Sequence, residues 1–311
     1  MKIATTIGDF KHYTPNWAEA VKQFEGTGFR YLDFDFYSVL YPGSPFLGDD
    51  WKKDVENAAE EAAKRGFTFV QAHSPDYNPL SDKTDHEAGM RALLRSIEAC
   101  GMLGIPNLVV HSGISETYRY PDGQEGYFKA NRAFYESLFP SMEKYQVNVL
   151  IENSARGNMG DNYFFMTGQE MSDFIDECHH PRLQACWDTG HANMDSRDQY
   201  REIRTLDSRL KAIHFQDNFG ACDEHFAPFM GTLDVDAVMQ GLLDSGFRGY
   251  LTFEAQNLLT LDGAWPHPRH KTSALAERKL PEPSLELRRE AEKLLYQIGK
   301  YVLTRYGCYE E

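Results

Sequence analysis

Cysteine is scarce in this 311-residue sequence, and long hydrophobic runs are absent from it. The five cysteines lie far apart, are odd in number and form no CxxC pair, which fits a reducing compartment better than a disulfide framework. No window approaches the roughly 20 apolar residues of a membrane span, and the first residues lack the features of a signal peptide. We therefore expect a cytoplasmic protein that binds no membrane.

Basic residues are also few. Lysine and arginine number 32 against 47 acidic residues, which gives a formal net charge of -15. Such a surface repels phosphate backbones unless a local basic patch overrides it, and no run of lysine and arginine supplies one. We expect no nucleic-acid partner. Hydrophobic residues make up 41% of the chain, enough for a sizeable core inside a charged surface.

The sequence contains short apolar runs that alternate with amphipathic segments carrying apolar residues at i, i+3 and i+4. The runs predicted as strands are residues 3–7, 31–36, 67–72, 107–110, 147–151, 183–187, 210–215 and 250–253. Strands separated by helices imply parallel pairing, and eight units predict a closed (β/α)8 TIM barrel. The rival is a doubly wound open sheet, but the strand-to-helix turns show neither GxGxxG nor a Walker A sequence.

We expect one domain over residues 1–311, with a long insertion at about 255–283 and a C-terminal helix at about 285–303. A loop of that length is usually functional, as a lid or a contact surface. The residues in it that draw notice are Trp265, His267 and Arg269. We expect them to cover the site or to form a subunit contact, and we expect a homo-oligomer.

Six consecutive predicted strands each finish on a potential metal ligand. These residues are His73, His111, Glu152, Asp188, His214 and Glu254. Any one of them alone is better interpreted as a helix cap or as a buried polar group with a hydrogen-bond partner. In a barrel, however, the carboxyl ends of the strands converge on one pocket, where crowded carboxylates would repel each other unless a divalent cation were bound. The pattern predicts a metal centre.

Two local motifs add candidates. Trp187-Asp-Thr-Gly-His191 places Asp188 and His191 close enough to share a metal, or to divide between metal and substrate. Asp223-Glu-His225 is a second carboxylate and histidine pair on the seventh loop, for which a solvated loop is the alternative. A mixed oxygen and nitrogen ligand set fits Mn²⁺, Co²⁺ or Zn²⁺ better than Mg²⁺ alone.

These motifs, together with Gly231-Thr-Leu-Asp234 and Phe253-Glu254, resemble the sugar phosphate isomerase/epimerase family of the xylose isomerase-like TIM-barrel superfamily, over essentially the whole chain. The resemblance implies that Glu152, Asp188, His214 and Glu254 bind one divalent metal, with Mn²⁺ the first candidate. It also implies a ketose-like sugar substrate, an enediolate intermediate, and Glu152 and Glu254 as the acid/base pair. His191 would orient a substrate oxygen.

Other activities stay open. In the apurinic-site endonuclease branch of the superfamily, three zinc ions are bound at positions matching nine residues of this sequence: His73, His111, Glu152, Asp188, His191, His214, Asp223, His225 and Glu254. All nine are present, but a nuclease needs a positive groove, and this chain is strongly acidic. His73 and His111 hold either a second ion or the substrate. Lyase chemistry on an oxidised sugar (dehydration or C-glycoside cleavage) and a non-catalytic metal-binding protein are the remaining alternatives.

One departure from the family concerns the seventh loop. Many members have a Pro-Gly-x-Gly sequence there, whereas this chain has Phe229 in place of a glycine. The shape of that loop is therefore left open by the sequence.

Overall fold

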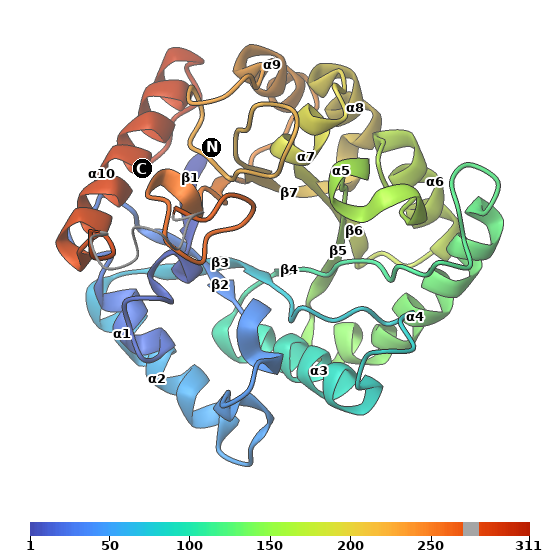
Figure 1. Ribbon diagram of the computed structural model, residues 1–311, viewed down its shortest axis with the longest axis horizontal. Helices are drawn as coiled ribbons and strands as arrows, with labels where there is room; N and C mark the ends of the chain where they lie inside the picture. The colour runs from blue at the N-terminus through green and yellow to red at the C-terminus, as the bar shows by residue number, and fades with distance from the viewer. Residues whose placement is uncertain (270–279) are drawn as a thin grey trace.

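Eight parallel strands form a closed barrel in the order in which they occur along the chain. The computed structural model describes residues 1–269 and 280–311. Figure 1 shows the strands at the centre and the helices around them. The strands are β1 (Lys2–Thr6), β2 (Tyr31–Asp35), β3 (Thr68–His73), β4 (Asn107–Val109), β5 (Asn148–Glu152), β6 (Leu183–Asp188), β7 (Leu210–Phe215) and β8 (Tyr250–Phe253). The predicted barrel is confirmed, and each predicted strand overlaps an observed one.

Helices surround the barrel, between successive strands and after the last one (Figure 1). They are α1 (Trp17–Lys22), α2 (Trp51–Arg65), α3 (His86–Leu103), α4 (Gln124–Tyr145), α5 (Arg156–Met159), α6 (Gly168–Cys178), α7 (Thr189–Met194), α8 (Gln199–Leu206), α9 (Val235–Asp244) and α10 (Leu285–Arg305). Local capping defines several of their ends. Thr167 and Glu170 form a capping box at the start of α6, and Gly66 ends α2 at a φ of 72°.

Two short helices, α7 and α8, lie between β6 and β7. α8 has only eight residues, of which just Gln199, Ile203 and Leu206 are buried. So short a helix carries too few apolar positions for a periodic signal. Its position is nevertheless stabilised from the core, because Gln199 Oε1 accepts a hydrogen bond from Trp187 Nε1 at 2.9 Å.

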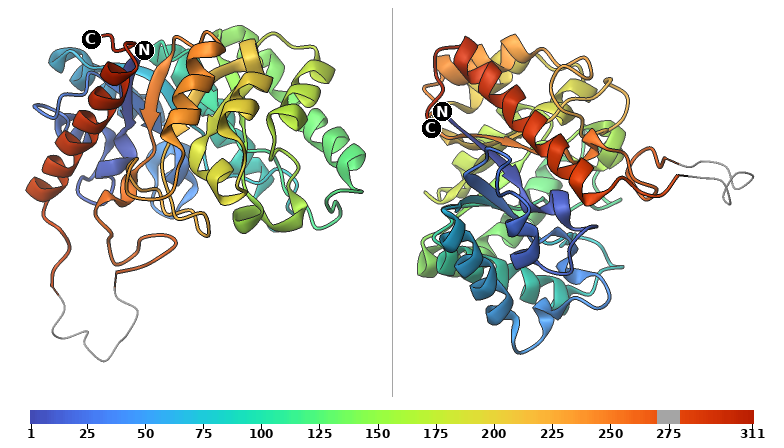
Figure 2. Two further views of the ribbon diagram at one scale, coloured as in Figure 1. Left: turned by 90° about the horizontal axis from the view of Figure 1, so that it is seen from above. Right: turned by 90° about the vertical axis from the view of Figure 1, so that its left-hand side faces the viewer.

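The last helix, α10, covers the line where β1 and β8 pair and the barrel closes. A Cβ atom at Gly299 would lie 2.8 Å from Phe253 Cε2 and 3.1 Å from Ile3 Cγ2, so glycine permits this close approach. The two termini lie together, at the end of the barrel opposite the loops that follow the strands (Figure 2). The amino group of Met1 lies 3.0 Å from Glu310 Oε1.

A buried charged cluster also fixes α10 to the barrel. Arg288 Nη2 lies 3.0 Å from Asp9 Oδ1 and 2.5 Å from Glu292 Oε1. Arg288 Nη1 donates to the carbonyl of Gln256 at 2.7 Å. Burial and the neighbouring Asp9 raise the pKa of Glu292 to about 8, against the opposing effect of Arg288. The guanidinium of Arg288 thus contacts two buried carboxyl groups.

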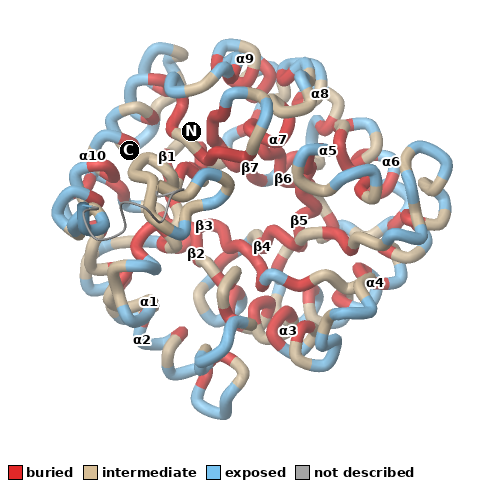
Figure 3. The backbone as a smooth tube through the Cα atoms, in the orientation of Figure 1, coloured by how far each residue is buried: buried red, intermediate tan, exposed pale blue. Residues whose placement is uncertain are grey.

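The interior of the barrel is packed beneath its carboxyl end, and the strands are the most buried part of the fold (Figure 3). Val109, Leu150, Cys186 and Ala212 form a separate buried apolar cluster. Each lies two residues before a predicted ligand, so the twofold alternation of strand side chains turns both residues of each pair inward. A layer of apolar side chains therefore forms the floor of the candidate site.

Among the residues that the structure describes, no helix combines the length and apolarity needed to cross a lipid bilayer. All five cysteines are free thiols, and Cys100, Cys178 and Cys186 are buried.

Candidate metal centre

Four of the predicted ligands meet at the carboxyl end of the barrel. Glu152 and Asp188 are the last residues of β5 and β6, His214 lies in β7, and Glu254 follows β8 directly. One ligand atom from each lies within 4.8 Å of the others. His214 Nδ1 lies 2.6 Å from Glu152 Oε1 and 3.3 Å from Glu254 Oε2. Both carboxylates therefore reach one point from strands that do not pair with each other.

The electrostatics of this cluster suit a cation. Burial alone would raise the pKa of Glu152, but His214, His111 and His73 outweigh it and hold the pKa well below its usual range. Asp188 shows the opposite balance: burial, together with the charges of Glu152 and Glu254, raises its pKa to about 7. A divalent ion would favour the ionised form of all these carboxylates. The carboxylate and imidazole donors fit Mn²⁺, Co²⁺ or Zn²⁺.

His73 and His111 form a second group with Glu152. Their ligand atoms and a Glu152 oxygen lie within 4.8 Å of one another. His111 Nε2 lies 2.8 Å from Glu152 Oε2, and His73 Nε2 lies 3.8 Å from the same oxygen. His73 Nδ1 contacts the carbonyl of Ser74 at 3.0 Å, which leaves Nε2 facing the site. Glu152 thus presents one oxygen to each group.

The pair Asp223 and His225 is not on a solvated loop, because both side chains are buried. Asp223 Oδ2 lies 3.1 Å from His191 Nε2 and 3.1 Å from His225 Nε2. The other ring nitrogen of His191 contacts the carbonyl of Asn153 at 2.9 Å, and that of His225 contacts the carbonyl of Glu254 at 2.9 Å. A substrate oxygen would reach His191 only in place of one of these partners.

Two positioning residues were missed by the sequence reasoning. Gln216 Nε2 donates to Asp223 Oδ1 at 2.8 Å and to Asp188 Oδ1 at 3.2 Å, so it connects the two groups. Asn153 Oδ1 accepts from the backbone N–H of Asp188 at 2.6 Å. Gln216 lies two residues after His214, so the alternation of strand side chains could have identified it as facing the site. A Cβ atom on Gly190 would lie 2.1 Å from Gln216 Oε1, which explains glycine there.

Phe229 adopts a φ of 75°, the left-handed region that favours glycine. The seventh loop therefore keeps a glycine-like backbone at this position although its residue carries a side chain. That side chain is exposed and lies against Tyr301, with ring centroids 6.3 Å apart. Phe229 in place of glycine therefore adds an exposed aromatic ring to the surface of the loop.

The three residues noted in the segment after β8 have different surroundings. Trp265 is 68% exposed. His267 Nε2 lies 3.5 Å from Glu224 Oε1 on the seventh loop. Arg269 donates to the carbonyls of Leu280 and Pro281 at 3.0 Å, so it joins the two described ends of its own segment. Their assignment to a lid or a subunit contact remains a prediction.

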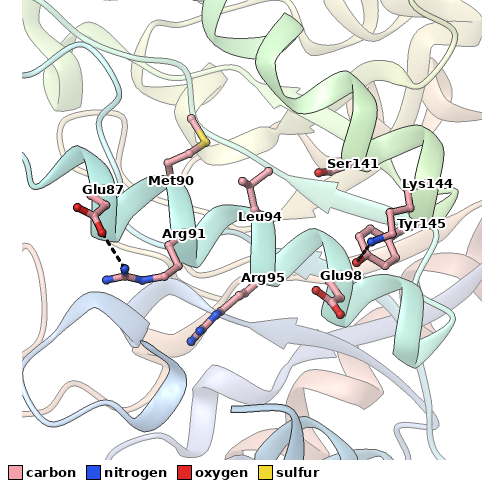
Figure 4. A pocket seen from close by; sticks show the side chains of 9 residues that line it. All are labelled: Glu87, Met90, Arg91, Leu94, Arg95, Glu98, Ser141, Lys144 and Tyr145. Atoms are coloured by element: carbon pink, nitrogen blue, oxygen red, sulfur yellow. Dashed lines mark hydrogen bonds and ion pairs between the residues drawn. The ribbon is translucent and has the colours of Figure 1, made fainter. Parts of the chain in front are cut away.

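An open groove lies elsewhere, between α3 and α4 on the helical ring (Figure 4). Its most evident contact is the ion pair from Glu87 Oε1 to Arg91 Nη1, at 3.1 Å. None of the side chains that line it is a histidine or a cysteine. The groove therefore lacks the imidazole donors that the cluster at the carboxyl end of the barrel contains.

Comparison with known proteins agrees with this architecture. Residues 27–275 match the family model described as the xylose isomerase-like TIM barrel. The chain belongs to this family.

Two relatives illustrate the similarity. An uncharacterized protein of Sinorhizobium fredii is 27% identical over 200 residues, which are 64% of this chain and 62% of that protein. The chain thus spans less than two thirds of that relative. The ketose 3-epimerase of Arthrobacter globiformis is 23% identical over 249 residues, which are 75% of this chain and 79% of the epimerase.

Solved structures share the fold. A D-tagatose 3-epimerase-like protein superposes with a TM-score of 0.71 at 16% identity, over 98% of this chain and 100% of its own. The IOLI protein with a binding zinc atom also gives a TM-score of 0.71, at 15% identity, over 98% of this chain and 99% of its own.

Proposed function

We propose that this protein is a metal-dependent sugar isomerase or epimerase that acts on a ketose-like substrate through an enediolate intermediate. The observation that carries the proposal is the convergence of Glu152 and Glu254 on His214 Nδ1, with Asp188 in the same cluster. The family and the ketose 3-epimerase relative support it. The same residues would bind Mn²⁺, Co²⁺ or Zn²⁺, or less favourably Mg²⁺.

The chemistry requires removal of a weakly acidic proton from a carbon next to a carbonyl. A bound divalent ion supplies Lewis-acid stabilisation of the charge that develops on oxygen. Glu152 and Glu254 would transfer the proton, since a pair of carboxylates on different strands can reach a substrate from different sides. Their exposure differs, with 2% for the Glu152 side chain and 20% for Glu254. Glu254 is therefore the more solvent-accessible carboxylate of the pair.

The decisive experiment is an exchange assay in deuterated water. The Mn²⁺-loaded protein is incubated with a panel of ketoses, aldoses, inososes and oxidised glycosides. Turnover should place deuterium on a carbon next to the carbonyl of an accepted substrate. Release of water or of an aglycone, in place of an isomeric sugar, would assign the lyase alternative. Absence of turnover and of exchange with every member of the panel would contradict the proposal.

A further inference from the structure

Outside the barrel centre, the structure brings together a cysteine, a glutamate and a histidine that the proposed activity does not use. Cys222 and Glu224 lie on the loop between β7 and α9, and His267 lies in the segment after β8. One ligand atom from each lies within 4.8 Å of the others. Glu224 is buried, Cys222 is half-buried and His267 is exposed. The group therefore opens to solvent on the side of His267.

The separation of His267 and Glu224 suits a small tetrahedral ion. Zinc binds nitrogen, oxygen and sulfur at about 2.0–2.3 Å, which places tetrahedral ligand atoms about 3.3–3.8 Å apart. His267 Nε2 and Glu224 Oε1 are separated by 3.5 Å. The other oxygen of Glu224 accepts from the backbone N–H of Phe219 at 3.2 Å, which orients the carboxylate. This contact leaves Oε1 of the buried carboxylate facing His267.

The backbone around the group is held in place by one side chain. Asn257 Nδ2 donates to the carbonyl of Glu224 at 2.9 Å and to the carbonyl of Trp265 at 2.6 Å. The backbone N–H of Asn257 donates to the carbonyl of His225 at 3.2 Å. The two chain segments that supply the three candidate ligands are therefore joined without any ion, which lowers the ordering cost of binding one.

We propose that Cys222, Glu224 and His267 bind a Zn²⁺ ion that fastens the segment after β8 to the loop carrying Asp223 and His225. The Cys222 thiol loses its proton to solvent on binding, and water occupies the fourth position on the exposed side. Thiolate and imidazole favour zinc over manganese, whereas the barrel centre offers oxygen and imidazole donors without a thiol among its four ligands. The two sites would therefore hold chemically different ions.

The test uses Co²⁺ as a spectroscopic substitute for zinc. The full chain is freed of metal, loaded with Mn²⁺ at the barrel centre and titrated with Co²⁺. A thiolate ligand gives a near-ultraviolet charge-transfer band that oxygen and imidazole ligands do not give. We expect one Co²⁺ to produce this band and Zn²⁺ to displace it. The absence of the band from the wild-type protein would overturn the proposal.

Variants locate the thiolate. Cys222→Ser should abolish the band, and His267→Ala should weaken Co²⁺ binding by about 100-fold or more, because even an outer-shell partner contributes about 10–100-fold. Cys308→Ser is the matched control and should keep the band. Cys186→Ser tests the thiol nearest the barrel centre, which lies in a group with Glu152 and His214. Loss of the band in Cys186→Ser but not in Cys222→Ser, or unchanged affinity in His267→Ala, would overturn the three-ligand site.

Discussion

Glu152 Oε1 lies 2.6 Å from His214 Nδ1, although 62 residues separate the two along the chain. The contact is possible because β5 and β7 both flank β6 and end at the same rim. Neither side chain has significant exposure, so each needs a charged or hydrogen-bonding partner. This pair is the core of the proposed metal centre, and the first predictions concern it.

Removing one ligand should remove the ion. Asp188→Asn and His214→Ala are each expected to lose bound metal, because either change removes one of the four proposed ligands. Elemental analysis of the purified variants measures the effect. Glu87→Gln, on the exposed surface of α3, is the control and should keep the metal content of the wild type. Full occupancy in both ligand variants would disprove the assignment.

Changing the proposed acid/base pair should stop turnover. Glu152→Gln and Glu254→Gln are each expected to lower kcat by about 10²–10⁴-fold, the usual contribution of a positioned proton-transfer group. The measurement is the initial rate on the substrate identified by the exchange assay, with metal content determined in parallel. An unchanged rate in either variant would shift the role of base to His111 or His73.

Gln216 should matter without touching the ion. Gln216→Ala removes the amide that joins Asp188 to Asp223 and leaves two buried carboxylate oxygens without that donor. We expect metal affinity to fall by about 10–100-fold, as for other outer-shell partners. Competition with a chelator measures the affinity. Gln240→Ala on the outer helix α9 is the matched control, and equal affinities in the two variants would exclude a positioning role.

The cluster of Asp9, Arg288 and Glu292 predicts a dependence of stability on pH. Burial raises the pKa of Glu292 from 4.5 to about 8, so its protonated form is favoured in the folded chain. The contribution of protonated Glu292 to the free energy of unfolding is complete below about pH 4.5. It is lost as the pH rises toward about 8, at up to about 1.4 kcal/mol per pH unit.

Glu292→Gln should therefore flatten the fall in stability between about pH 5 and pH 8. Denaturant titrations at several pH values measure the free energy of unfolding. Glu290→Gln, on the exposed side of the same helix, should retain the wild-type slope. A slope that Glu292→Gln leaves unaltered would show that other groups cause it.

Incision of abasic DNA is not expected. A net charge of -15 opposes the phosphate backbone that supplies most non-specific affinity, although all nine positions of the nuclease branch are filled. An abasic duplex incubated with the Zn²⁺ or Mn²⁺ form at physiological salt tests this. Efficient incision that Glu254→Gln abolishes would promote the nuclease over the sugar enzyme.

The sequence was sufficient to predict the barrel, because buried strands and amphipathic helices each produce a recognisable pattern of apolar residues in the local sequence. It was also sufficient to find candidates such as Glu152 and Glu254, because strand ends in a barrel converge whatever the details of packing. The structure adds the contacts among them. Whether each candidate binds metal stays a prediction.

Contacts without a local pattern were not predictable. Arg288 and Asp9 are 279 residues apart, and nothing near either residue identifies the other. Likewise, the approach of His267 to Glu224 depends on the path of a long irregular segment. The role of Gln216 was missed for a different reason. Its position directly after the seventh strand was known, but an amide side chain is not a typical metal ligand or acid/base group.

The strand order has a consequence for the chain during its synthesis. The proposed ligands begin with His73 on β3, but the set is complete only when β8 delivers Glu254 and pairs with β1. A nascent chain that has emerged only through β7 offers an open array of imidazoles and carboxylates. Firm retention of the proposed ion would thus begin only with barrel closure, and metal uptake would then report that synthesis has passed the last strand.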